Sequence, residues 1–155
     1  MAYVKVEGRA TFAYSQNLRE FGTVALDSGV SRFVADVSAC LQMDSTFIGV
    51  LAMIALQATR RGVSVNIGGA SERLRDTFST LGLDRLFVFQ SDPMCGVAAG
   101  SARDPDDIGG SASRDEVRKT MLDAHKALGE VAPENKIRFQ SVVELLEKRG
   151  ETDDG

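Results

Sequence analysis

Hydrophobic and polar positions in the first 90 residues follow two alternating periods. Runs with an apolar residue at every second position predict strands, and runs with apolar residues three and four positions apart predict amphipathic helices. The strand patterns lie at 4–11 (with the strand expected to end at Gly8), 31–40, 63–69 and 86–90. The helix patterns lie at 15–29, 46–62 and 71–82. This alternation predicts an α/β fold whose sheet is mixed and partly parallel, with four to five strands and interleaved helices.

The last third of the chain has a different pattern. After an Asp-, Gly- and Ser-rich stretch, which predicts a flexible linker, come two amphipathic helices at 114–128 and 134–149. Two short helices cannot form a core alone, so they must pack on the rest of the chain, on a second copy or on a partner. The predicted units are an α/β domain at 3–95, the linker at 100–113 and a C-terminal helical hairpin at 114–150.

Composition narrows the functional classes. The net charge is −4, and it resides in residues 101–155 because 1–100 carry equal numbers of acidic and basic side chains. This balance argues against nucleic acid as a partner. No apolar run approaches the roughly 18 to 20 residues that span a bilayer, so membrane insertion is not expected. With two cysteines and no secretory leader pattern, a cytoplasmic protein with reduced thiols is expected.

Motifs for catalysis and cofactor binding are missing from the sequence. No phosphate-binding glycine motif, no nucleophile elbow, no HExxH and no Cys/His cluster is present. We therefore expect no metal, no cofactor and no enzymatic activity. The single histidine, His125, is expected on a helix surface, and the Gly68-Gly69 turn is only a weak signal for a nucleotide. A module that binds another protein fits this inventory better.

The stretch Asp44-Ser45-Thr46, between a predicted strand and the strongest helix pattern, carries the clearest functional signal. Ser45 or Thr46 could cap the helix by accepting from its unpaired N–H groups, an effect worth about 1 kcal/mol. The same position suits a phosphate, because the helix N-terminus carries about half a positive charge. Local chemistry leaves both roles open.

The segment MDSTFIGVL at 43–51 resembles the phosphorylation-site signature of the STAS family, the anti-sigma-factor antagonist domains related to sulfate-transporter tails. Elements downstream agree with the family pattern, at 61–62, 73–75 and 81–83. The first strand departs from it, because residues 8–11 read Gly-Arg-Ala-Thr where many members have Gly-x-Leu/Ile-Asp. The resemblance covers about residues 3–95.

This resemblance implies a partner-switching protein that is a substrate rather than an enzyme. Unphosphorylated, it would bind an anti-sigma factor that is a Ser/Thr kinase, and a Ser/Thr phosphatase would reset it. Ser45 is the implied phosphorylation site, with Thr46 the second choice and the expected cap. The exposed side of the helix at 46–61 is expected to help form the docking surface, together with these partner-binding residues: Asp44, Ser45, Thr46, Phe47 and Gly49.

Other functions remain open. The chain could be a STAS scaffold in a stress-signalling assembly, or an accessory subunit of a membrane lipid transporter, with no phosphorylation switch in either case. A homodimer through the C-terminal helices is a further option. Gly68-Gly69-Ala70-Ser71 is the only signal for a small-molecule binder.

Overall fold

The computed structural model describes residues 1–91 and 113–153, so the predicted linker at 100–113, apart from Ser113, lies outside the described residues. The strands are β1 (Ala2–Ala10), β2 (Arg32–Met43), β3 (Ser64–Gly68) and β4 (Val88–Gln90). The helices are α1 (Ser15–Asp27), α2 (Ser45–Arg60), α3 (Glu72–Thr80), α4 (Arg114–Val131), α5 (Pro133–Arg138) and α6 (Gln140–Asp153). A short 3₁₀ helix, η1 (Phe12–Tyr14), precedes α1.

The described strands form one sheet in the order β1-β2-β3-β4, and each neighbouring pair is parallel. The predicted α/β class is therefore confirmed, but the described sheet is parallel where a mixed one was expected. A helix joins each strand to the next within residues 1–91, and such crossovers place successive strands in the same direction. β1 also continues past Gly8 to Ala10, because Gly8 has a φ of +68° at a register shift rather than at the strand end.

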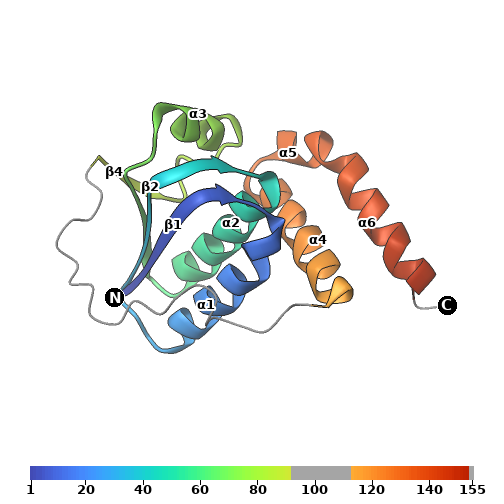
Figure 1. The fold of residues 1–155 in the computed structure, drawn as a ribbon, viewed down its shortest axis with the longest axis horizontal. Helices are drawn as coiled ribbons and strands as arrows, with labels where there is room; N and C mark the ends of the chain where they lie inside the picture. Colours follow the sequence, from blue (N-terminus) through green and yellow to red (C-terminus); the bar gives the residue numbers. More distant parts are fainter. Residues whose placement is uncertain (92–112, 154–155) are drawn as a thin grey trace.

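One face of the sheet is buried beneath helices (Figure 1). A row of residues paired across the strands lies on this face and packs in or against a single apolar core. The row consists of Val4, Ala35, Ile67 and Phe89. Most of α2 belongs to this core, and α1 packs against it. The Asp44 N–H donates to the Ala10 carbonyl oxygen at 2.9 Å, so the first turn of α2, with the predicted functional segment, lies at the end of the sheet where β1 and β2 finish.

A polar cluster lies on the opposite face. The Asp36 carboxylate is 5% exposed and accepts hydrogen bonds from the Tyr3 hydroxyl, at 2.7 Å, and from the hydroxyl and N–H of Ser38. Burial raises the pKa of this carboxyl, but the Ser38 and Tyr3 hydrogen bonds outweigh burial, so the pKa is lowered overall.

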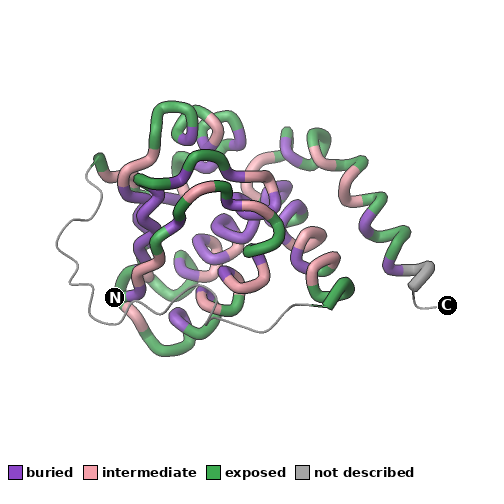
Figure 2. Tube along the Cα trace, in the orientation of Figure 1, coloured by how far each residue is buried: buried purple, intermediate pink, exposed green. Residues whose placement is uncertain are grey.

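The C-terminal helices pack on the α/β unit. α4 lies along α2, and α6 packs on the side of α4 that faces away from the sheet (Figure 1). The predicted helix at 134–149 is broken at Phe139 into α5 and α6. Most of α6 is exposed, with Leu146 as its buried apolar contact (Figure 2). Within the described ranges, none of the helices has the length and hydrophobicity to cross a membrane.

Candidate functional site

Asp44 is the N-cap of α2. Its backbone is extended, with φ −83° and ψ 168°, and its Oδ1 atom accepts a hydrogen bond from the Phe47 N–H at 2.8 Å. Its Oδ2 atom accepts a second bond from the Phe12 N–H at 2.7 Å. The carboxylate therefore ties η1 to the start of α2, and it satisfies a helix N–H that would otherwise need a serine or threonine hydroxyl.

Ser45 therefore does not cap the helix, and it makes a contact that was not predicted from the sequence. Its hydroxyl lies 3.0 Å from Nε2 of His125 on α4. His125 Nδ1 lies 2.6 Å from the Met121 carbonyl oxygen. Because a carbonyl can only accept, Nδ1 carries the ring proton; in the neutral ring Nε2 then accepts from the Ser45 hydroxyl.

The expectation that His125 lies on a helix surface is wrong. The residue is 3% exposed, and its ring packs edge to face on Phe139, with centroids 5.1 Å apart. Both ring nitrogens have partners, so burial leaves neither of them without a hydrogen bond. A histidine on a helix surface could bond to water and would not need a protein partner for each ring nitrogen.

Two other predicted site residues have structural roles. Thr46 was expected to cap α2, but Asp44 does so and Thr46 is 3% exposed. Phe47 is also buried in the apolar core and cannot present its ring to a partner. Both side chains are buried, so neither is available to a partner.

α4 of the same chain lies against much of the side of α2 that was expected to dock a partner, where Met53, Leu56 and Gln57 are half-buried. Gly49 was expected to allow a close approach, and the approach is confirmed, but the neighbour is α4 of the same chain. A Cβ atom added to Gly49 would lie 2.5 Å from the Ala124 carbonyl oxygen. Ala124 itself is fully buried.

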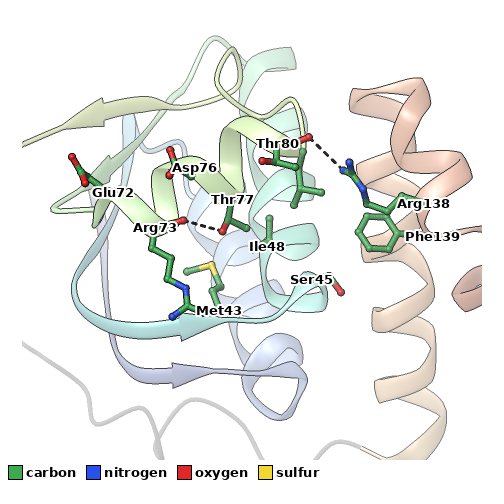
Figure 3. A pocket seen from close by; sticks show the side chains of 11 residues that line it. Met43, Ser45, Ile48, Glu72, Arg73, Asp76, Thr77, Thr80, Arg138 and Phe139 are labelled. Carbon is green, nitrogen blue, oxygen red and sulfur yellow. Dashed lines mark hydrogen bonds between the residues drawn. The ribbon is translucent and has the colours of Figure 1, made fainter.

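A cleft of about 660 Å³ lies beside Ser45 (Figure 3). α3 supplies one wall and the α5–α6 junction the other, and Figure 3 shows the Ser45 hydroxyl directed toward the C-terminal helices. Two arginines and two carboxylates line the cleft, so its charges balance. The charged lining residues are Glu72, Arg73, Asp76 and Arg138. Ser45 is half-buried at the cleft rim, and it is reachable from this side.

Sequence reasoning missed two exposed aromatic residues next to the site. Phe12 and Tyr14 of η1 are 49% and 54% exposed. The N–H of Phe12 is held by Asp44, which places this aromatic pair beside the start of α2. The signal was present in the sequence TFAYS, where two aromatic residues interrupt the polar turn between β1 and α1.

Two solved structures are similar to this chain. A sulfate transporter family protein from Wolinella succinogenes matches with a TM-score of 0.50 and 14% identity, over 59% of this chain and 76% of that one. The anti-sigma factor antagonist SpoIIAA in its unphosphorylated form matches with a TM-score of 0.49 and 14% identity, over 58% and 77%. No curated protein sequence matches this chain.

The sequence itself matches a family model. The model is described as "Mlab, STAS domain", and it covers residues 2–89. That range includes the whole sheet, α1 to α3 and the turn that carries Asp44 and Ser45, and it ends before α4. The chain therefore belongs to the STAS-domain family.

Proposed function

We propose that this chain is a phosphorylatable protein-binding switch of the anti-sigma-factor-antagonist type. Unphosphorylated, it binds a Ser/Thr-kinase anti-sigma factor; phosphorylated on Ser45, it releases that kinase, and a phosphatase resets it. The observation that carries the proposal is that Asp44 and Ser45 have different roles at the start of α2. Asp44 caps the helix, so the half-buried Ser45 hydroxyl is not needed as a cap for the backbone N–H groups, and it lies beside an open cleft.

The phosphorylation step is a phosphoryl transfer from ATP bound to the kinase. Ser45 Oγ forms a bond to the γ-phosphorus, the bond from that phosphorus to the bridging oxygen breaks, ADP leaves, and the hydroxyl proton is released. Thr46, the second-choice acceptor, is 3% exposed, so its hydroxyl is much less accessible than that of Ser45. The protein supplies the acceptor and the docking surface, and it performs no chemistry of its own.

The docking surface that we propose is the patch formed by Asp44, Ser45 and the aromatic pair Phe12 and Tyr14. Exposed aromatic side chains beside a charged rim are typical anchors of protein interfaces. A phosphate on Ser45 would add about −1.5 to −2 charges next to the Asp44 carboxylate. A partner that accommodates one negative charge would then face three, and its affinity would fall.

Intact mass of the protein purified from its own cells tests the acceptor. We expect a species one phosphate heavier, with fragmentation of the peptide at 33–60 locating the phosphate on Ser45. Ser45→Ala should abolish this species and keep the fold, whereas the matched variant Thr46→Val should retain it. A phosphate that persists in Ser45→Ala would overturn the assignment.

Binding of the chain to the kinase that phosphorylates it tests the charge effect. We expect Ser45→Asp to weaken the kinase complex at least tenfold, about 1.4 kcal/mol. Phe12→Ala should also weaken the complex, whereas Val24→Ala, which shortens a more exposed apolar side chain near the other end of α1, should not. An unchanged dissociation constant for Ser45→Asp contradicts the charge switch.

The second candidate is an accessory subunit of a membrane lipid-transport assembly, without a phosphorylation switch. The family match is to a STAS domain and specifies no phosphorylation switch, so it fits this candidate too. Such a subunit should co-purify with an ATPase and should carry no phosphate on Ser45 under any growth condition. The same intact-mass measurement therefore separates the two candidates.

A further inference from the structure

The C-terminal segment α4–α6 is attached to the α/β unit through an apolar centre and through polar contacts around it. Ala124 and Leu128 of α4 are fully buried in the common core. Thr120 is 2% exposed and bonds to Gln16, and the Arg19 guanidinium donates to both Thr120 and Asp123. Arg19 and Asp123 form a salt bridge of 2.9 Å. These contacts join α4 to α1.

A second polar anchor lies at the other end of the segment. The Asn135 side chain is fully buried and donates from Nδ2 to the carbonyl oxygens of Leu81 and Leu128, both at 2.8 Å. Arg138 Nη1 donates to Asn135 Oδ1 at 2.9 Å and to the Thr80 carbonyl at 3.4 Å.

α4–α6 contributes no strand to the described sheet. The segment can therefore leave α2 without breaking a ladder of strand hydrogen bonds. Its departure would uncover the outer stripe of α2, which includes Gly49, Met53 and Leu56.

The Ser45–His125 hydrogen bond couples this segment to the candidate phosphorylation site. A phosphate cannot fit in the 3.0 Å between Ser45 Oγ and His125 Nε2, because the P–O bond and the phosphate oxygens need more space than that. The Asp44 carboxylate is adjacent in the chain, and it disfavours new negative charge there.

The cleft gives the phosphate no strong alternative position. Its lining charges balance, and one of its two cations, Arg138, already holds α5 to the end of α3. A phosphate that turned into the cleft would compete for Arg138 and loosen the same segment. It would also leave Nε2 of the buried His125 without its partner.

We propose that α4–α6 is an intramolecular latch on α2, which the Ser45 hydroxyl holds closed through His125 and which a phosphate on Ser45 opens. The latch rests on the proposed function, because it assigns a second effect to the same modification. Phosphorylation then removes the docking patch at Asp44 and Phe12 and uncovers the outer stripe of α2.

Hydrogen–deuterium exchange of the full-length chain tests the latch. Phosphoserine is installed at position 45 by genetic-code expansion, so no kinase is needed. We expect amides in 114–131 to exchange at least tenfold faster than in the unmodified chain, with β1 and β2 unchanged. Phosphoserine at position 71 is the matched control: Ser71 also lies at a helix N-terminus and is exposed, but it bonds to Leu74 and not to α4.

A second variant keeps the test independent of the phosphate. His125→Ala removes the latch contact without adding charge, and faster exchange in 114–131 with an intact sheet is again expected. Unchanged exchange in 114–131 in either protein overturns the latch, as does a loss of protection that extends through the whole sheet, which would mean that α4–α6 is inseparable from the core. The native mass measurement is unaffected by these outcomes, so failure of the latch and failure of the proposed function are distinguishable.

Discussion

Helices α2 and α3 begin in similar ways and yet use their serines differently. Each follows a parallel strand, and each has a serine at or beside its N-cap. At α3 the N-cap is Ser71, whose hydroxyl accepts from the Leu74 N–H at 3.2 Å. At α2 the N-cap is Asp44, and Ser45, one residue later, bonds to a helix 80 residues away in the sequence. The cap residue thus decides whether the neighbouring serine serves the local backbone or the tertiary structure.

The two helices also differ in what packs against them near their N-termini. Substitution of Gly49 is expected to have the largest effect on stability of the changes that test this difference. Gly49→Ala should destabilise the protein by about 3 kcal/mol, because the new Cβ would meet the backbone of α4, which cannot move without undocking. Gly129→Ala is the matched control. Its Cβ would lie 2.8 Å from the Cγ atom of Lys136, an exposed and flexible side chain, so this variant should be neutral or slightly stabilising.

Thermal or denaturant unfolding of both glycine variants measures the free energies. Equal free energies of unfolding for Gly49→Ala and the parent chain would show that α4 does not press on α2 as closely as the structure places it. A larger loss for Gly129→Ala than for Gly49→Ala would reverse the comparison.

Replacing the two caps gives a smaller difference. Ser71→Ala removes one neutral cap and should cost about 1 kcal/mol. Asp44→Ala removes a charged cap and also the acceptor for the Phe12 N–H, so about 2 kcal/mol is expected from chemical denaturation. If the two variants lost the same stability, the bond from Phe12 to Asp44 would contribute nothing.

The elements of the fold were predictable because their signals are local. Alternating apolar residues placed the four strands, and the helix pattern at 71–82 begins at Ser71, the residue that caps α3. The bounds shifted where a single residue bends the strand without ending it, as at Gly8. The cap of α2 was assigned to the wrong residue because aspartate, serine and threonine are all good caps, and composition alone cannot rank three in a row.

The covering of α2 was not predictable in the same way, because it joins residues far apart in the chain. The pattern showed that the C-terminal helices needed a surface, but it could not choose between this chain, a second copy and a partner. One signal for His125 was available: it lies four residues after Met121, next to the apolar stripe of α4. Helical spacing therefore placed it at the edge of the buried face, where a histidine needs partners for both nitrogens.

A double-mutant cycle between Ser45 and His125 measures the smallest expected effect, the coupling free energy of their hydrogen bond. The same cycle with Ser71 in place of Ser45 is the control. Ser45→Ala leaves a buried Nε2 without a donor and should cost about 1 kcal/mol. His125→Phe removes that need and keeps a ring against Phe139, so adding Ser45→Ala to it should cost almost nothing further. The coupling free energy from denaturant unfolding should be about 1 kcal/mol. Ser71→Ala combined with His125→Phe should be additive, because Ser71 bonds to its own helix. Additivity at both serines would mean that α2 and α3 begin alike after all, with Ser45 as independent of α4 as Ser71 is.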